Sequence, residues 1–231
     1  SRRYRCISYD ARGYLPSEVR FYQAEATDVD FDTKTVRCAT RSDGTAGSSF
    51  SLTYDKLVVA IGSTTNTYGT EGTEENCLFM KEVTDGIEAR AKIFAQFEQT
   101  TLPISTAATA GGKPKTKAEI DEERHEMLHF VVVGGGPTGV EVAAELQDLI
   151  TDNLAVGQSG GRSGHSLYKN ALGGRPTVTL IQSGSRLLAA YHPSVSAIAL
   201  REMRAAGVEV RLNQRVKKVL PDRVVVLDKK T

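Results

Sequence analysis

The chain has 231 residues, a formal net charge of +1 and 25% charged residues, values typical of an ordinary soluble globular protein. A nearly neutral chain has no overall positive field with which to bind nucleic acid or an anionic membrane surface, so we expect no nucleic-acid partner. Its three cysteines lie far apart and form no C-x-x-C pair, which argues against a disulfide framework, a zinc site and a redox-active dithiol and favours a reducing compartment.

The first part of the chain is expected to be β structure. Polar and apolar residues alternate in short stretches separated by turn residues, a pattern typical of a small meander. These stretches lie at 19–26, 26–32, 35–40 and 49–54. An apolar run at 57–62 follows and ends in glycine, and we expect it to form one buried strand.

Two helices are predicted between this β region and the middle of the chain. Residues 84–99 have the spacing of an amphipathic helix, with Asp85 as the expected N-cap and Glu88 three residues later. The side chains expected to face inward are Ile87, Ala91, Phe94 and Phe97. A shorter, charged helix is predicted at 121–128, after a stretch near 100–118 whose composition favours a surface loop.

The most informative feature is the run HFVVVGGGPTGVE at 129–141, which predicts a buried strand, a glycine turn and the start of a helix. Three consecutive valines suit a central parallel strand covered on both faces. Gly134, Gly136 and Gly139 fill the glycine positions of G-x-G-x-x-G, which allow a tight turn, close approach to a pyrophosphate, and close packing of helix on strand. Pro137 suits the first turn of a helix, whose N–H groups then face the phosphates. This run predicts dinucleotide binding.

The rest of the chain predicts further α/β structure. The helix after the glycine turn has its apolar stripe at Val142, Leu146, Leu149 and Ile150. The next elements are a loop at 152–175, a strand at 177–181, a helix from an N-cap at Ser194 to about Ala206, Gly207 at its C′ position, and a strand at 208–212. This alternation predicts an α/β fold: a Rossmann-like NAD(P)-binding domain with a parallel sheet.

These residues resemble the type II (alternative) NADH:quinone oxidoreductases, flavoproteins with two dinucleotide-binding domains and a disulfide-reductase-like fold. The resemblance is carried mainly by LHFVVVGGGPTGVEVAAEL at 128–146 and YDKLVVAIG at 54–62. Shorter matches lie at 64–66, 79–81 and 121–124. The similarity extends over roughly residues 18–231.

The resemblance implies a mechanism and a set of binding residues. NADH or NADPH binds the domain after residue 128 and passes a hydride to FAD, and the reduced flavin passes two electrons to ubiquinone. Ala60 and Gly62 match the strand end that approaches FAD, and Glu141 matches a glutamate that lies near the nicotinamide and the flavin. The alternative for Glu141 is an acid that complements the helix dipole. The residues implied in dinucleotide binding are Gly134, Gly135, Gly136, Pro137, Thr138 and Gly139.

The residue that ends the second strand departs from the family pattern. An acid at this place binds the ribose hydroxyls of NADH and repels a 2′-phosphate, but here the strand is followed by Gln182. Ser183, Ser185 and Arg186 lie close enough in sequence to meet a phosphate. We therefore expect NADPH to be accepted as well as NADH; the alternative is a neutral replacement that keeps the preference for NADH.

Other parts of the family pattern are missing from these 231 residues. No FAD-binding glycine fingerprint precedes the meander, and neither the later Gly-Asp motif nor the amphipathic membrane helices follow residue 212. We therefore expect an internal segment of a longer flavoenzyme, with a partial FAD-binding domain at 1–68 and an NAD(P)H-binding domain at 69–231. Alone, this segment is expected to bind NAD(P)H weakly and not to hold FAD.

The resemblance further implies ubiquinone as a partner and a peripheral place on the inner mitochondrial membrane, reached through parts outside this sequence. A homodimer and docking in a respiratory assembly both stay open. So do two other functions: a non-catalytic NAD(P)-binding or structural subunit, and another FAD-dependent pyridine-nucleotide reductase. The four histidines lack metal-ligand spacing, so no metal site is expected, and no apolar run approaches the roughly 18 residues that span a bilayer.

Overall fold

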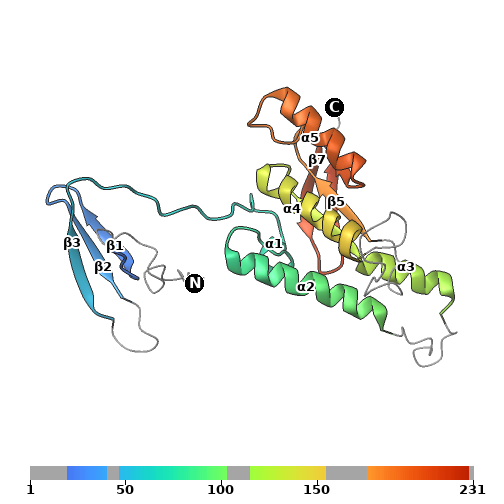
Figure 1. Ribbon diagram of the computed structural model, residues 1–231, viewed down its shortest axis with the longest axis horizontal. Helices are drawn as coiled ribbons and strands as arrows, with labels where there is room; N and C mark the ends of the chain where they lie inside the picture. Colours follow the sequence, from blue (N-terminus) through green and yellow to red (C-terminus); the bar gives the residue numbers. More distant parts are fainter. Residues whose placement is uncertain (1–19, 41–46, 103–114, 155–175, 229–231) are drawn as a thin grey trace. The chain divides into compact units, whose positions relative to one another are not determined.

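The computed structural model of the chain describes residues 20–40, 47–102, 115–154 and 176–228. The chain divides into two compact units, 1–63 and 64–231, and each has its own sheet structure (Figure 1). Most of the two predicted loops, 103–114 and 155–175, lies outside the described residues.

The first unit contains a three-stranded antiparallel sheet in the order β1-β2-β3. The strands are β1 (Glu25–Asp30), β2 (Thr35–Ala39) and β3 (Ser49–Thr53). Oδ1 of Asp30 closes the first turn by accepting hydrogen bonds from the N–H groups of Asp32 and Thr33, both at 3.0 Å. The predicted meander is confirmed, except that residues 20–24 precede its first strand instead of belonging to it.

The apolar run at 57–62 does not form the expected buried strand. It has no regular secondary structure, and Val58 and Ile61 are 84% and 89% exposed. An apolar run becomes a buried strand only where neighbouring strands bond to its backbone and other side chains cover its faces. In the described part of the first unit, the three strands of the meander pair only with one another, so this run has no such neighbour there.

The second unit contains a parallel sheet in the order β4-β5-β6. Its strands are β4 (His129–Val133), β5 (Thr177–Ile181) and β6 (Glu209–Arg211). The first crossover contains α4 (Pro137–Asp148), which continues into the π-helical segment η2 (Leu149–Leu154), and the second contains α5 (Pro193–Ala205). Parallel strands joined in sequence through helices confirm the predicted α/β class.

The central strand of the described sheet is β5, not β4. Four of the five β5 residues are buried, whereas Val131 and Val133 of β4 are 36% and 52% exposed. Phe130 and Val132, on the other face of β4, pack against the main core. The valine-rich strand β4 therefore lies at the edge of the described sheet with one face covered. Successive side chains of a strand point to opposite faces, so a run of valines is compatible with burial of one face or of both.

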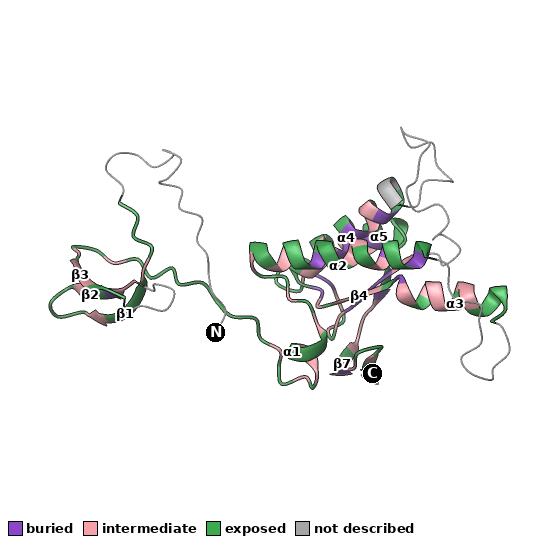
Figure 2. Ribbon diagram, turned by 90° about the horizontal axis from the view of Figure 1, so that it is seen from below, coloured by how far each residue is buried: buried purple, intermediate pink, exposed green. Residues whose placement is uncertain are grey.

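The main hydrophobic core lies between one face of the sheet and the helices of the second unit. Figure 2 shows the buried residues in purple along α4, α5, α2 (Val83–Thr101) and the strands beside them. Ring centroids of Phe97 and Phe130 are 5.9 Å apart, which joins α2 to β4. The largest fully buried apolar side chains are Phe97, Leu128, Leu180, Leu187 and Val178.

The inward face of α2 agrees only in part with the prediction. Ala89, Phe97 and Thr100 are buried, while Ile87 is 65% exposed and Ala91 is also exposed. Of the four side chains expected inside, Phe97 is buried and Phe94 is half-buried. Both sets of residues have helical spacing and share Phe97, which stacks on Phe130 of β4.

A β-hairpin packs against the carboxyl end of β5, on the face opposite the main core. It consists of β7 (Gln214–Val219) and β8 (Val224–Asp228), which pair antiparallel. Ile181 packs against Val216 and Val219 in a second, smaller apolar cluster. The short helix α1 (Thr73–Asn76) is tied to the hairpin, since Asn76 Nδ2 donates to the Val219 carbonyl at 3.2 Å.

Two helix caps differ from the predicted ones by a few residues. α2 begins after Glu82, and Asp85, the expected cap, accepts a hydrogen bond from the Glu82 N–H at 2.9 Å. α5 begins after His192, whose Nδ1 accepts from the N–H of Ser194, the expected cap, at 3.3 Å. Its end is as predicted, with Gly207 at φ +100° after the C-cap.

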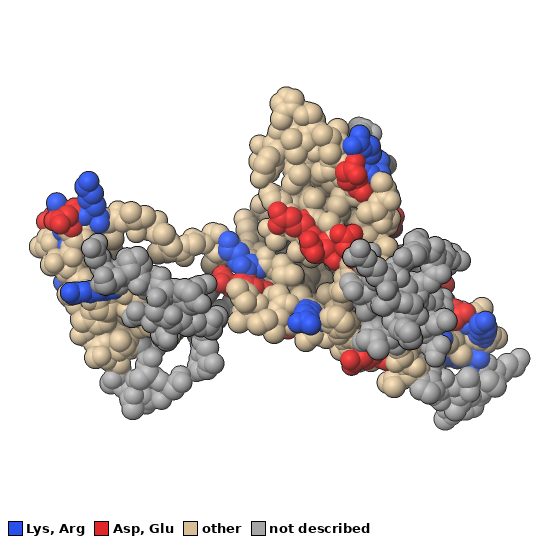
Figure 3. Space-filling model, in the orientation of Figure 1, with Lys and Arg blue, Asp and Glu red and all other residues tan. Residues whose placement is uncertain are grey.

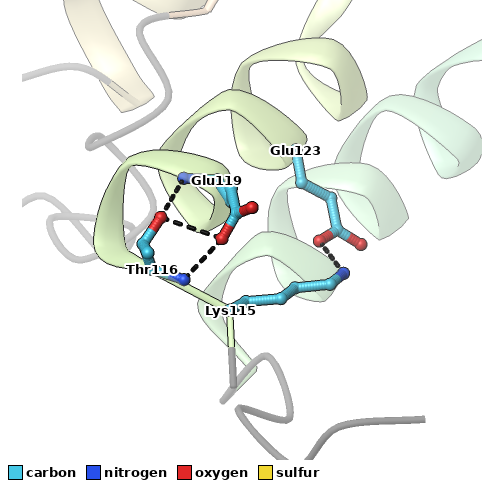
Figure 4. Close-up of polar contacts among 4 residues, drawn as sticks. All are labelled: Lys115, Thr116, Glu119 and Glu123. Carbon is cyan, nitrogen blue, oxygen red and sulfur yellow. Dashed lines mark hydrogen bonds and ion pairs between the residues drawn. The ribbon is translucent and has the colours of Figure 1, made fainter. Parts of the chain in front are cut away.

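The start of α3 (Lys117–Met127) also differs from the prediction, since the helix begins four residues before the predicted 121. Figure 4 shows the capping box responsible: the Glu119 carboxylate accepts from the Thr116 N–H at 2.6 Å, and the Thr116 hydroxyl accepts from the Glu119 N–H at 3.3 Å. The bonds from Thr116 lower the pKa of Glu119 below its ordinary value. Lys115 pairs with Glu123 beside this box.

Candidate functional site

The glycine turn, residues 134–139, lies at the carboxyl end of β4 and leads into α4. Gly134 has a φ of +112°, which other residues adopt only with strain, and its N–H donates to the Ile181 carbonyl at 2.9 Å. Gly136 is the N-cap of α4, and Pro137 lies in its first turn as predicted. A Cβ at Gly139 would lie 1.9 Å from the Gly134 carbonyl oxygen, so helix and turn approach at a distance that only glycine permits.

The start of α4 offers a backbone surface suited to an anion. A Cβ at Gly136 would meet no atom within 4 Å, so no described residue blocks an approach to the backbone there. The first N–H groups of a helix have no partner within it, and the dipole gives this end a partial positive charge. Pro137 has no N–H, so Thr138 and Gly139 supply the N–H groups of the first turn. These residues fit the pyrophosphate of a dinucleotide.

Gly135 is held by the segment that follows β5, residues 182–188, here called the β5 loop. Its N–H donates to Oε1 of Gln182 at 3.1 Å, and its carbonyl accepts from the Leu188 N–H at 2.7 Å. A Cβ at Gly135 would lie 2.7 Å from Cδ2 of Leu187 and 3.0 Å from Cβ of Gln182. Leu187 is fully buried, so Gly135 is packed against the core. No sequence motif predicts that Leu187 packs against Gly135 or that the Leu188 N–H bonds to its carbonyl.

Gln182 is the first residue after β5, and its side chain bridges the glycine turn and the β5 loop. Its Nε2 donates to the Arg186 carbonyl at 3.3 Å. The Arg186 guanidinium donates through Nη2 to the Ala189 carbonyl at 2.7 Å, and Ser183 is exposed. The predicted glycines and Gln182 therefore meet at the carboxyl ends of adjacent parallel strands, the edge at which open α/β sheets bind ligands.

The other predicted site residues lie away from this edge or in the first unit. Glu141 is exposed and lies beyond the first turn of α4, where stabilisation by the helix dipole falls off, which weakens the dipole interpretation of this residue. Ala60 and Gly62 belong to the first unit and are both exposed, and Gly62 has a φ of +72°.

The sequence does not predict a chain of polar contacts across the second face of the sheet. His129 Nε2 lies 2.8 Å from the Thr179 hydroxyl, which donates to Glu209 at 3.0 Å, and Arg211 Nε donates to the other oxygen of Glu209 at 2.8 Å. Burial lowers the pKa of His129, and the bond from Arg211 lowers that of Glu209. Only the register of β4, β5 and β6 could have revealed this chain.

Three further observations concern metal, membrane and nucleic-acid binding. Within 20–40, 47–102, 115–154 and 176–228, no group of three or more His, Cys, Asp or Glu side chains is placed to hold a metal ion. No helix in the same ranges is long and apolar enough to cross a bilayer. The face shown in Figure 3 carries acidic and basic side chains in separate groups over its described part, and the largest of these groups is acidic.

Known proteins share this arrangement. A family profile described as pyridine nucleotide-disulphide oxidoreductase matches residues 10–231. The chain is 35% identical over 204 residues to the external alternative NAD(P)H-ubiquinone oxidoreductase B2, mitochondrial, of Arabidopsis thaliana, covering 87% of this chain and 31% of that protein. It is 41% identical over 140 residues to the external NADH-ubiquinone oxidoreductase 2, mitochondrial, of Saccharomyces cerevisiae, covering 60% and 23%. The chain thus spans about a third or less of these relatives.

Solved structures agree with the fold. NDH2 from Plasmodium falciparum, in complex with NADH, matches with a TM-score of 0.68 and 28% identity, over 90% of this chain and 36% of that one. A ferredoxin reductase from Rhodopseudomonas palustris, at 16% identity and a TM-score of 0.55 over 94% of this chain and 41% of that one, shows the fold alone. The resemblance to alternative NADH:quinone oxidoreductases is confirmed by these relatives. The family profile covers nearly the whole chain, which therefore belongs to the pyridine nucleotide-disulphide oxidoreductase family.

Proposed function

We propose that the chain is the NAD(P)H-binding part, with a piece of the FAD-binding domain at 1–68, of a flavin-dependent NAD(P)H:ubiquinone oxidoreductase that does not pump protons. The observation that carries this proposal is the glycine turn at the carboxyl ends of β4 and β5, with the N-terminus of α4 beside it. Ubiquinone is proposed as the electron acceptor because relatives are named as ubiquinone oxidoreductases.

In this proposal each candidate residue has a distinct task. The backbone of the glycine turn and the first turn of α4 bind the pyrophosphate, and Gln182 binds the adenine-side ribose. Glu141, exposed on α4, lies toward the nicotinamide end, and Ala60 and Gly62 contribute to the FAD site. When bound, FAD supplies the redox chemistry by accepting a hydride from NAD(P)H and delivering two electrons to ubiquinone.

Gln182 also supports acceptance of NADPH. A carboxylate at this place would repel a 2′-phosphate, whereas a carboxamide brings no charge. Ser183 is exposed beside it, and Arg186 uses Nη2 for the Ala189 carbonyl and keeps other N–H groups for a phosphate. Gln182→Glu is expected to raise the ratio of kcat/KM for NADH over NADPH by about a hundredfold, the effect of a few kcal/mol in a half-buried site. An unchanged ratio leaves a neutral replacement with NADH preference as the explanation.

The same proposal includes a place and partners for the whole protein. The named relatives are mitochondrial, and we infer peripheral attachment to the inner mitochondrial membrane through parts outside these residues. Ubiquinone is then the electron acceptor. A size measurement of the detergent-solubilised full-length protein separates a monomer from a homodimer or a docked subunit of a respiratory assembly.

The test is NADH oxidation by the full-length protein with a short-chain ubiquinone, with and without added FAD. Oxidation that depends on both flavin and quinone supports the proposal. Binding of NADH without oxidation under either condition favours a non-catalytic NAD(P)-binding subunit. Oxidation with a one-electron protein carrier but not with quinone favours another pyridine-nucleotide reductase.

A further inference from the structure

Gly135 occupies a variable position of G-x-G-x-x-G, yet the fold uses both of its backbone polar groups. Its N–H donates to Gln182 Oε1 at 3.1 Å and its carbonyl accepts from the Leu188 N–H at 2.7 Å. A Cβ here would enter the space of the buried Leu187 side chain. The second residue of the glycine turn is thus joined to the β5 loop by two hydrogen bonds and by packing.

The partners of the Gln182 side chain determine which way its carboxamide faces. The Gly135 N–H can only donate and the Arg186 carbonyl can only accept, so Oε1 faces Gly135 and Nε2 faces Arg186. An ionised glutamate could accept from Gly135, but it has no N–H for Arg186 and would place a charged oxygen against that carbonyl. Glutamine therefore joins the two segments in a way that glutamate cannot.

The two hydrogen bonds that the Gln182 carboxamide makes to Gly135 and Arg186 use only half of its hydrogen-bonding capacity. Oε1 has a second lone pair and Nε2 has a second N–H, and the side chain is half-buried, not sealed from solvent. One acceptor and one donor are thus left over after Gly135 and Arg186 are bonded. The same side chain can hold the two protein segments and bind a ribose hydroxyl or a phosphate oxygen.

We propose that Gln182 is a positioning residue that couples the glycine turn to the β5 loop before the dinucleotide binds. The inference rests on the proposed function, since it requires the pyrophosphate at the glycine turn and the adenine-side ribose at the β5 loop. Two segments already held in place lose less freedom on binding, which favours affinity. The Gly135 N–H is committed to Gln182, so the donors to pyrophosphate come from Gly136, Thr138 and Gly139.

The experiment compares three variants of the full-length flavoprotein with wild type. Gln182→Met keeps the length of the side chain and removes both bonds, whereas Gln182→Glu keeps the acceptor for Gly135 and removes the donor to Arg186. The matched control is Gln147→Met, which removes a bond from Gln147 Nε2 to Thr151 at 3.2 Å, toward the far end of α4. The readouts are amide hydrogen exchange in the peptide that covers 134–139, and KM and kcat with NADH and NADPH.

Gln182→Met is expected to speed exchange of the Gly135 amide at least tenfold and to raise KM for both dinucleotides about tenfold, or about 1.4 kcal/mol, with kcat nearly unchanged. Gln182→Glu restores slow exchange at Gly135, while residues 186–188 exchange faster than in wild type. The control Gln147→Met leaves exchange and both kinetic constants at their wild-type values.

Rapid exchange of the Gly135 amide in the wild-type protein overturns the proposal. So do an unchanged KM in Gln182→Met and a fall in kcat at constant KM, since the latter places Gln182 in the transfer step. If Gln182→Met does not fold, the exchange pattern of Gln182→Glu decides. A wild-type protein that shows slow Gly135 exchange but binds no NAD(P)H refutes the proposed function and leaves the bridge itself intact.

Discussion

Two segments of this chain share one pattern, an apolar run that ends in glycine, yet only one of them forms a strand. FVVVG at 130–134 is bonded along β5, and its inner face packs against the main core. LVVAIG at 57–62 has no strand beside it in the described part of the first unit, and Val58 is 84% exposed. An apolar pattern shows that a segment can be buried, but burial also requires adjacent strands and side chains that cover it.

Gly139 of the glycine turn, which follows the first run, and Gly62, which ends the second, should differ most in their tolerance of a side chain. Gly139→Ala places a Cβ 1.9 Å from the Gly134 carbonyl oxygen, and we expect a loss of about 4 kcal/mol or more in the stability of the second unit, with loss of NAD(P)H binding. Gly62→Ala meets no atom within 4 Å and is expected to cost only the strain of a φ of +72°, about 1 kcal/mol. Urea unfolding and an NADH titration measure both effects.

Gly86→Ala serves as the control for this pair of variants. Gly86 lies inside α2 without a positive φ, and a Cβ there meets no atom within 4 Å. Alanine is expected to stabilise the helix there by up to about 1 kcal/mol. If Gly139→Ala instead binds NADH as wild type does, the close approach of helix and turn is not required for the site.

A smaller contrast is expected between the apolar side chains of the two units. Leu180 is fully buried in β5, and Leu180→Ala should cost about 3 kcal/mol because a cavity remains in the core. Val58→Ala should change the free energy of unfolding by less than about 0.5 kcal/mol. A cost above about 1 kcal/mol at Val58 in this chain would contradict its exposure. The same substitution in the full-length protein sharpens the comparison, since a larger cost there means that residues 57–62 have gained neighbours.

Features set by the residues of one segment could be predicted from the sequence, whereas features set by contacts between distant segments could not. The bounds of β4 and β5 and the glycine turn follow from local patterns, and the structure has them as expected. The inward face of α2 was only partly predicted: Phe94 and Phe97 lie on it as expected, whereas Ile87 and Ala91 are exposed. The bond between Gly135 and Gln182 joins residues 47 apart, so no local pattern contains it. The glycine spacing predicted a dinucleotide, whereas FAD and the ubiquinone acceptor came from the family resemblance.

The smallest predicted contrast between the two units is in their response to acid, and it depends on a residue at the start of β4. Residues 1–63 contain no histidine, whereas His129 begins β4 and contacts Thr179. Burial first, and then the nearby His125, lower the pKa of His129 below 6.5; Arg211 acts in the same direction and Glu209 opposes it. The unfolded chain therefore binds this proton more readily than the folded one, so the stabilisation is present above pH 6.5 and is lost as the pH falls below that value.

Acidification from about pH 7.5 to about pH 5.5 should therefore lower the Tm of the second unit by a few degrees at most, since His129 is partly exposed and the effect stays below about 1 kcal/mol. Glu209 adds to the loss only at lower pH, because its lowered pKa keeps it ionised in this range. His129→Gln retains an N–H to donate to Thr179 and cannot titrate, so the pH dependence should shrink while the bond survives. Equal losses of Tm in wild type and His129→Gln would assign the acid response to other groups and remove β4 as the source of the difference between the units.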